Sequence, residues 1–401
     1  MLPVRLQMLG EIRLKPMNIG TVAALSVHWI EAEDQLGDLL VQAPEAWAVD
    51  TEFMREQTYY PQLALLQISD GTTVWLLDPL KLPAAAMLQA VRRAAPCLLY
   101  AASEDLSVFE YALGWRPNTI VDVQVAAAFL GLGPALSLRD ILLQRLDVMV
   151  DKSETRSNWL QRPLSEQQRL YAASDVAWLH KLWAPLEQML SERGFSAWFR
   201  DECRRLCARV SLVIEAQPHW SLRSNRELPE DVQRRLFRLL HWRDQLARES
   251  DRPRNWIAPP ALLFALAERN PRELGQVVAI LQKLQLPGTE RRARTLLGGL
   301  CEARAEEAHF LAAPAPLDRA QRALAAQFKQ WVEKRATELG IPPELLAPRR
   351  LLDALARNQA QWPDEFTGWR QEALRDLSGT TSAGPASAGA ANTKSAEPSP
   401  A

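Results

Sequence analysis

Short apolar segments alternate with helical ones from about residue 22 to residue 185 of this 401-residue chain. The runs "WAVDTEF", "LALLQIS", "TVWLLDP" and "CLLYAA" are short and rich in apolar or aromatic residues, as buried strands are. "SEDLSVFEYAL" and "LSEQQRLYAASDVAWLHKLWAPLEQML" have helical spacing. Ser165 precedes the second of these as an N-cap, with Gln168 at the capping-box position. The pattern predicts an α/β domain.

From about residue 186 onward the pattern predicts helices alone. "LPEDVQRRLFRLLHWRDQLARES" is amphipathic, and Pro-rich breaks at "DRPRNWIAPP" and "LAAPAPLD" divide the rest of the chain into helical blocks. The segments "LHWRDQLARESDRPRNWIAPPALLFALAERNP" and "FKQWVEKRATELGIPPELLAPRRLLDALARNQ" are weak copies of each other. Such a repeat indicates two small tandem helical domains, in which Trp242 and Trp369 are predicted core anchors.

Together these patterns predict an irregular extension over residues 1–24, an α/β domain over 25–210, helical domains over 215–300 and 316–378, and a disordered Ser/Ala/Gly/Pro-rich tail over 379–401. Translation that starts at Met1 or at Met17 fits the irregular extension equally well.

The composition, 47% hydrophobic and 24% charged, is that of a globular protein, and no apolar run has transmembrane length. Neither a secretory signal nor a zinc pattern among the four cysteines is found, so we expect a cytoplasmic protein with no membrane and no obligate protein partner. Acidic residues outnumber basic ones over 1–216, and basic residues outnumber acidic ones over 217–310. This asymmetry permits a polyanion partner but does not establish one.

Two carboxylates lie within the first apolar strand. Residues i and i+2 of a strand face the same side, so Asp50 and Glu52 point to one place, with Thr51 opposite. Oxygen ligands of this kind suit Mg²⁺ or Mn²⁺, although an isolated D-x-E is more often an exposed strand end. Asp105 lies near the start of a helix, where the helix dipole alone would favour it. Tyr171 and Asp175 are four residues apart on one helix face.

"VDTEFMREQTYYPQLALLQ", "SEDLSVF" and "DKSETRSNWLQRPLSEQQRLYAASDVAWL" together resemble the three motifs of the DEDD exonucleases, in their tyrosine-containing subgroup. The wording is most similar to the ribonuclease D family, and the helical repeats resemble its tandem HRDC domains. The resemblance covers about residues 25 to 377. It implies a ribonuclease H-like mixed sheet followed by two all-α HRDC domains.

The resemblance also implies an activity, a 3′-5′ exoribonuclease that releases nucleoside 5′-monophosphates and trims tRNA precursors and other structured RNAs. Asp50, Glu52, Asp105 and Asp175 would hold two divalent ions, Mg²⁺ or Mn²⁺, and Tyr171 would orient the attacking water. Two such ions can activate a water and stabilise the leaving oxygen of a phosphodiester. Asp122 falls where relatives carry Asp and is expected to support the site without binding metal. Tyr100 stands where the family often has His.

Candidate RNA contacts surround these positions: Thr51, Phe53, Arg156 and Trp159, with Arg55, Gln57, Tyr59, Tyr60, Asn158 and Arg162 beside them. Arginine holds phosphate and aromatic rings stack on bases, but ordinary loop and helix-entry packing explains the same residues. Exposed arginines of the helical repeats, Arg234, Arg235, Arg291 and Arg292, are either solvated or phosphate contacts.

Two alternatives stay open at this point: a 3′-5′ DNA exonuclease on the same scaffold, because no catalytic residue selects the 2′-hydroxyl, and a non-catalytic RNA-binding module. Occupation of all five expected positions argues against the second. Neither G-x-S-x-G nor a Walker or dinucleotide glycine motif is found, which disfavours a small-molecule hydrolase.

Overall fold

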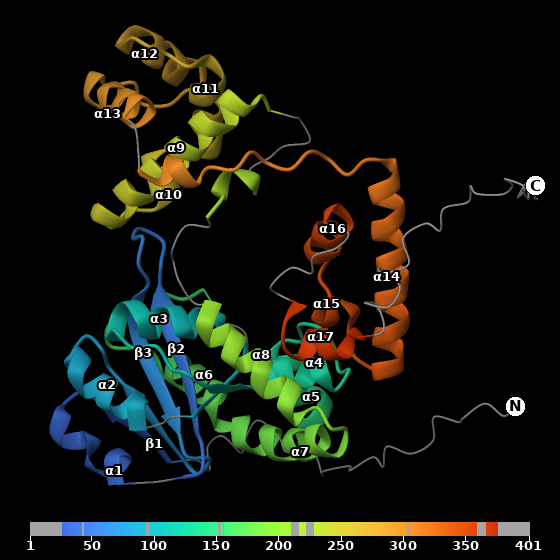
Figure 1. The fold of residues 1–401 in the computed structure, drawn as a ribbon. Helices are drawn as coiled ribbons and strands as arrows, with labels where there is room; N and C mark the ends of the chain where they lie inside the picture. Colours follow the sequence, from blue (N-terminus) through green and yellow to red (C-terminus); the bar gives the residue numbers. More distant parts are fainter. Residues whose placement is uncertain are drawn as a thin grey trace, which may run out of the picture. The chain divides into compact units, whose positions relative to one another are not determined.

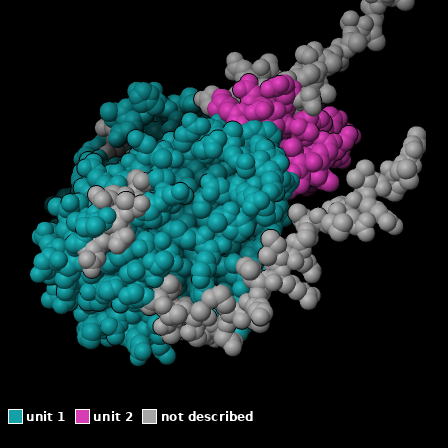
Figure 2. All heavy atoms as spheres, turned by 90° about the horizontal axis from the view of Figure 1, so that it is seen from below, with its two compact units in different colours: residues 1–316 teal, residues 317–401 magenta. Residues whose placement is uncertain are grey.

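The computed structural model describes residues 26–41, 44–93, 96–150, 154, 156–209, 216–221, 228–302, 305–358 and 366–375. The predicted N-terminal extension and C-terminal tail lie outside these residues. The chain divides into two compact units, residues 1–316 and 317–401, which Figure 2 colours separately. Within the described residues, no helix is both long and apolar enough to span a bilayer.

A six-stranded mixed sheet forms the framework of the first unit (Figure 1). Its strands, in the order β1-β4-β3-β2-β5-β6, are β1 (Ser26–Ile30), β2 (Trp47–Met54), β3 (Gln62–Ser69), β4 (Thr73–Leu77), β5 (Cys97–Leu99) and β6 (Ile120–Asp122). β2, β3 and β4 pair antiparallel in sequence order, whereas β1, β5 and β6 join them as parallel strands. The expected α/β architecture with a mixed sheet is thus present, and the strand-like runs of the sequence all became strands.

The central strands are continuous apolar runs because helices cover both of their faces. Leu65, Leu66 and Ile68 of β3 and Val49 of β2 have no exposed surface. α3 packs on β2 and β3, and α6 packs on β2, β3 and β4. The elements around the sheet are η2 (Glu33–Leu36), α1 (Gly37–Val41), α2 (Ala84–Arg93), α3 (Ser103–Leu113), α4 (Val123–Phe129), α5 (Leu138–Leu146), α6 (Glu166–Ala177), α7 (Leu179–Glu192) and α8 (Ser196–Arg209).

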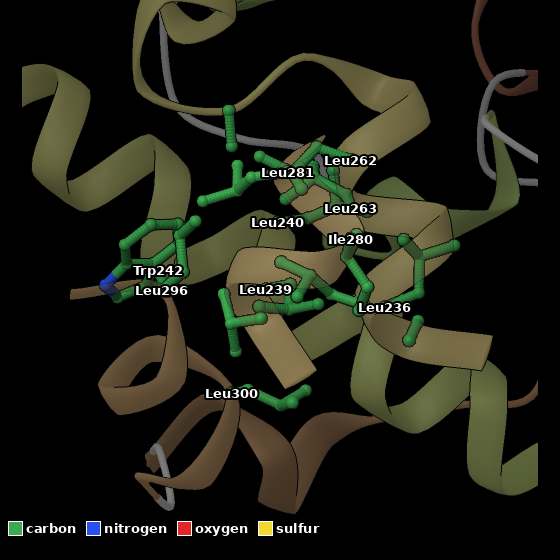
Figure 3. Packing of buried hydrophobic residues seen from close by; sticks show 14 of the residues in the cluster. Leu236, Leu239, Leu240, Trp242, Leu262, Leu263, Ile280, Leu281, Leu296 and Leu300 are labelled. Atoms are coloured by element: carbon green, nitrogen blue, oxygen red, sulfur yellow. The ribbon is translucent and has the colours of Figure 1, made fainter. Parts of the chain in front are cut away.

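A helical bundle comes next within the same unit, and no strand lies beyond β6 in the described part of the chain. Its elements are η3 (Pro218–Trp220), α9 (Glu230–Glu249), α10 (Arg254–Ile257), α11 (Pro260–Arg269), α12 (Leu274–Lys283), α13 (Glu290–Cys301) and η4 (Ala305–His309). The apolar stripe of α9 packs against α11, α12 and α13 around Leu240 and Trp242 (Figure 3). Gly299 lies against the Trp242 ring so closely that a Cβ there would be 2.4 Å from it.

The second unit begins with the same three-element order as that bundle. Its helices are α14 (Arg319–Leu339), α15 (Pro343–Leu346), α16 (Arg349–Arg357) and α17 (Trp369–Ala373). A long helix, a one-turn helix after a Pro-containing turn and a third helix therefore recur as α9–α10–α11 and α14–α15–α16. Trp369 is 2% exposed and Trp242 is 8% exposed, so both predicted anchors are core residues.

Candidate active site

β2 supplies the first two acidic side chains of the site. Asp50 and Glu52 alternate with Thr51 along this strand, which lies between β3 and β5. Gln67 of β3 is the cross-strand partner of Asp50, and its Nε2 lies 3.4 Å from Asp50 Oδ2, a long contact. The register shifts between Glu52 and Phe53, a β-bulge directly after the second carboxylate, and pairing with β3 resumes at Phe53 and Met54. Both carboxylates therefore lie on a central, paired strand.

α6 adds the third acidic side chain. The predicted capping box is observed: Ser165 Oγ accepts from Gln168 N at 3.0 Å, and the Gln168 side chain accepts from Ser165 N. Packing of α6 on β2 brings Asp175 to the strand carboxylates. One oxygen from each of Asp50, Glu52 and Asp175 lies within 4.8 Å of the others. Segments more than a hundred residues apart in sequence thus converge.

Asp105 reaches the site from the opposite face of β2. It lies in the first turn of α3, is 6% exposed, and accepts a 2.6 Å hydrogen bond from the Thr51 hydroxyl. It does not belong to the 4.8 Å group. It is nevertheless close enough for its charge to raise the pKa of Asp50 and of Glu52. The structure therefore gathers three predicted ligands tightly and places the fourth beside them, on Thr51.

Asp122 fixes the chain that leads into α3. Its carboxylate accepts hydrogen bonds from Ala101 N and Ala102 N at 3.2 and 2.9 Å, and also caps α4 through Gln124 N and Val125 N. Ala101 has a φ of 58°, in the left-handed region that a side chain disfavours. The two bonds that Asp122 accepts hold this turn, which leads directly into the first turn of α3, where Asp105 lies. Asp122 occupies the supporting place that the sequence predicted.

Burial and mutual repulsion both act on the carboxylates. Burial raises the pKa of Glu52 to about 9, and the charges of Asp175 and Asp105 add to it. The pKa of Asp105 and that of Asp175 rise to about 7, again mainly through burial. Burial also places the pKa of Asp50 well above its usual value. Placing four such groups together is costly unless positive charge accompanies them.

A divalent cation would supply the positive charge that these carboxylates lack. Among the described residues, no lysine or arginine forms an ion pair with Asp50, Glu52, Asp105 or Asp175. The donor atoms are all carboxylate oxygens, the ligands that Mg²⁺ and Mn²⁺ prefer. The residues present therefore fit a divalent metal.

Tyr171 lies one helical turn before Asp175 and is partly exposed. Its ring is 5.9 Å from that of Trp159, which is 2% exposed. Trp159 therefore has almost no surface left for stacking on a base, contrary to our expectation of an RNA contact. Its observed contact is with the ring of Tyr171.

The other candidate RNA contacts differ in their surroundings. Arg156 is exposed and Phe53 is partly exposed, so both are accessible to a substrate. Thr51 is buried and bonded to Asp105, so its observed contact is with the site itself. Arg162 is occupied by protein: it donates to both carboxylate oxygens of Asp78, at 2.8 and 2.6 Å, and to backbone carbonyls.

Sequence reasoning missed two supports of the site. Gln67 is a fully buried polar residue inside the apolar run of β3, and its polarity within that run was a signal for it. Asp78, only 1% exposed, is the acceptor for Arg162, and nothing local in the sequence marks that long-range pair. Tyr100, where the family often has His, donates a 2.7 Å hydrogen bond to Leu136 O.

Comparisons with known proteins agree with this geometry. Residues 27–191 match the 3′-5′ exonuclease family, and residues 232–308 match the HRDC domain. Ribonuclease D of Xanthomonas oryzae pv. oryzae is 38% identical over 353 residues, which cover 86% of this chain and 96% of that protein. The chain belongs to the ribonuclease D family. The ribonuclease D of Pseudomonas paraeruginosa is 33% identical, with 88% and 96% of the two chains covered.

A ribonuclease D crystal structure gives the same result for the fold. The Escherichia coli enzyme, described as "an exoribonuclease involved in structured RNA processing", is 32% identical with a TM-score of 0.75, over 89% of this chain and 98% of that one. The expected order, an exonuclease domain on a mixed sheet and then an HRDC helical domain, is confirmed. As a member of this family the chain is a 3′-5′ exonuclease.

Proposed function

We propose that this ribonuclease D family member is a metal-dependent exoribonuclease that releases nucleoside 5′-monophosphates from the 3′ ends of structured RNAs, tRNA precursors among them. The convergence of Asp50, Glu52 and Asp175 within 4.8 Å carries this proposal, with Asp105 beside them. The family relationship supports RNA as the substrate, because the related Escherichia coli protein is described as an exoribonuclease. Free cysteines fit a reducing, cytoplasmic setting.

We assign Asp50, Glu52, Asp105 and Asp175 as the residues that would hold two divalent ions, Mg²⁺ or Mn²⁺. Two such cations, when bound, supply Lewis-acid activation of a water and neutralise charge on the leaving 3′ oxygen. The Tyr171 hydroxyl, on the α6 face that carries Asp175, forms a hydrogen bond that orients the attacking water. An unperturbed tyrosine pKa of about 10 makes it a weak base, so orientation is the role that suits it.

Within this proposal the domains have separate tasks. Residues 25–210 perform catalysis, and the helical domains over 215–300 and 316–378 position RNA. Arg156, which is exposed, and Phe53, which is partly exposed and follows Glu52 on β2, are assigned to the substrate end. In the first helical domain Arg234 and Arg235 already pair with Glu230 and Asp231 at 2.9 Å, which limits what they offer to phosphate.

A 3′-tailed hairpin RNA tests the proposal directly. With Mn²⁺ or Mg²⁺ we expect the 3′ tail to be shortened one nucleotide at a time until digestion stops near the duplex. No products should form when EDTA is added. Asp105→Asn should abolish turnover, whereas Glu104→Gln, an exposed carboxylate on the same helix turn, should leave it unchanged. Internal cleavage, or full activity of Asp105→Asn, would refute the mechanism.

A DNA strand with the same 3′ end separates the enzymatic alternative. Faster removal of deoxynucleotides than of ribonucleotides would assign the chain as a DNA exonuclease on this scaffold. Tight RNA binding without turnover by the wild-type protein would instead assign a binding module.

A further inference from the structure

The loop between β2 and β3 is held by a residue of the HRDC domain. Asp251 Oδ1 accepts hydrogen bonds from the backbone N–H groups of Tyr59 and Tyr60, at 2.9 and 3.0 Å. Asp251 follows α9 and has a φ of 46°, a left-handed conformation that aspartate tolerates better than most residues. Asp251 therefore has an uncommon backbone conformation and also accepts two hydrogen bonds from the exonuclease domain with one carboxylate oxygen.

The Tyr59 side chain makes a second set of contacts with the same domain. Its hydroxyl donates to Asp244 Oδ1 at 2.9 Å and accepts from Arg254 at 2.8 Å. Arg254 Nε also donates to Asp244 Oδ1, at 2.6 Å, and the guanidinium lies 4.9 Å from the centre of the Tyr59 ring. Tyr59 is 2% exposed and Asp244 is fully buried. Burial raises the pKa of Tyr59 to about 12.

The same loop contacts α3 and follows β2, two of the three elements that supply the acidic residues of the site. Arg55, three residues after Glu52, donates from Nε to Tyr59 O at 3.0 Å. The Tyr60 ring lies 5.1 Å from that of Tyr111 on α3, the helix whose first turn carries Asp105. A shift of Tyr59 and Tyr60 would therefore displace residues at the end of β2 and on α3.

We infer that Asp244, Asp251 and Arg254 of the HRDC domain form a clamp that positions the Arg55–Tyr60 loop for catalysis. These three are positioning residues that act through Tyr59 and Tyr60 and touch no substrate. The inference deepens the proposed function and depends on it for its catalytic readout. It assigns the HRDC domain a role at the reacting end of the RNA, separate from any grip on the rest of the molecule.

Two substitutions of Asp251 distinguish the effect of its acceptor oxygen from the effect of its left-handed backbone conformation. Asp251→Gly keeps the left-handed backbone but removes the acceptor oxygen. Asp251→Asn keeps both, because an asparagine carbonyl accepts the same two bonds and tolerates that φ. A trinucleotide is the substrate of choice, since it minimises contact with the outer surface of the HRDC domain.

We expect Asp251→Gly to lower kcat on the trinucleotide by about tenfold to a hundredfold, since small misplacements of catalytic groups cost that much. Asp251→Asn should stay within about twofold, the tolerance typical of a retained hydrogen bond. The assays are run below the unfolding temperatures of all three proteins, so that unfolding does not account for a lower kcat. Equal kcat values for wild type and Asp251→Gly, or equal losses in both variants, would overturn the clamp.

Amide hydrogen exchange at Tyr59 and Tyr60 tests the clamp without any catalytic readout. Exchange should quicken in Asp251→Gly and remain slow in Asp251→Asn, and unchanged exchange in Asp251→Gly would also overturn the clamp. If the wild-type protein turns over no RNA, the proposed function fails by that result alone. The exchange rates then still decide whether Asp251 holds the loop.

Discussion

The Thr51 hydroxyl donates a 2.6 Å hydrogen bond to the Asp105 carboxylate, from a position between two carboxylates that point the other way. β2 therefore presents Asp50 and Glu52 on one face, and on its other face Thr51 holds Asp105 of α3. This bond also lowers the pKa of Asp105 against the larger effect of burial, which raises it. Thr51 is the link between the two halves of the acidic site.

Replacing this link should weaken metal binding without removing a ligand. Thr51→Val keeps the shape of the side chain and loses the hydroxyl, so Asp105 is held less well and is protonated more easily. Loss of such a supporting partner typically costs about 10- to 100-fold in metal affinity or activity. Titration of activity with Mn²⁺ measures the change. Thr51→Ser, which keeps the hydroxyl, should need about the wild-type concentration.

Removing one carboxylate charge should stabilise the metal-free protein. The pKa of Glu52 is raised to about 9 and that of Asp175 to about 7, above their usual values near 4. Their stabilising contribution is therefore complete below pH about 4 and is lost as pH rises through the folded-state pKa values. Over that range the folded protein keeps protons that the unfolded chain has already released, so raising the pH favours unfolding. Thermal unfolding in EDTA should accordingly move to lower temperature between pH 5 and pH 9.

Asp175→Asn should flatten that dependence and raise the unfolding temperature in EDTA at pH 8. A gain of about 1 kcal/mol corresponds to about 2–4 °C in a domain of this size. Mg²⁺ should raise the unfolding temperature of the wild type and leave that of the variant nearly unchanged. A variant that melts below the wild type in EDTA would show that repulsion is not what the metal relieves.

Tyr171→Phe should separate orientation of water from binding of metal. The phenylalanine ring retains packing on Trp159 and loses only the hydroxyl. We expect kcat to fall by about 100-fold, the lower end for loss of a positioned proton-handling group. The Mn²⁺ concentration for half-maximal activity should be unchanged. A raised metal requirement with little change in kcat would place Tyr171 in metal binding instead.

The local features of this molecule could be predicted from its sequence. The strand-like runs, the Ser165–Gln168 capping box and the repeated helical order were all predictable, because each depends on spacing within a few residues. Period-2 alternation placed Asp50 and Glu52 on one face of a strand, and the family resemblance assigned roles to all four carboxylates, Asp105 and Asp175 included. For Trp159 the sequence left RNA stacking and helix-entry packing both open, and only the tertiary packing shows that the ring is buried.

Contacts between distant segments were the part that local patterns could not reveal. Tyr59 and Tyr60 have the composition of a nucleic-acid contact, yet the bonds to Asp244 and Asp251 cross about 190 positions of chain. A buried charge such as Asp244 is indistinguishable in sequence from the exposed charges around it on α9. Only the tertiary fold decides which acidic residue is enclosed.

Acid should destabilise the helical bundle of the first unit through His219 of η3. This residue is 2% exposed and lies among Phe237 and Phe310, with ring centres 5.5 and 5.2 Å away. Burial lowers its pKa to about 4, aided by the charge of His241 and opposed by the carbonyl of Leu311. The neutral form is thus favoured in the fold, so its stabilisation is present above pH about 6.5 and is lost as pH falls through about 4.

A glutamine at this position retains an N–H donor for Leu311 O and cannot gain a proton. His219→Gln should therefore lose less thermal stability than the wild type between pH 7.5 and pH 5. His28→Gln, at an exposed histidine of β1, should follow the wild-type curve. Identical curves for wild type and His219→Gln would remove His219 as the cause.

Arg162 should prove to be a structural residue. Its guanidinium joins three separate segments: the Asp78 carboxylate at the end of β4, Ala64 O in β3 and Trp159 O before α6. Asp78 is 1% exposed, so Arg162→Ala would leave a buried charge without its partner. Such a loss typically costs about 3–5 kcal/mol of folding free energy. Urea unfolding measures it directly.

Lysine at the same position distinguishes structure from substrate binding. Arg162→Lys keeps the positive charge, which is enough for a simple phosphate contact, but cannot form the two parallel bonds to Asp78 and the further bonds to carbonyls. A structural role predicts that Arg162→Lys is clearly less stable than the wild type, with a KM for RNA close to the wild-type value where both are folded. A raised KM with undiminished stability would return Arg162 to the RNA-binding surface.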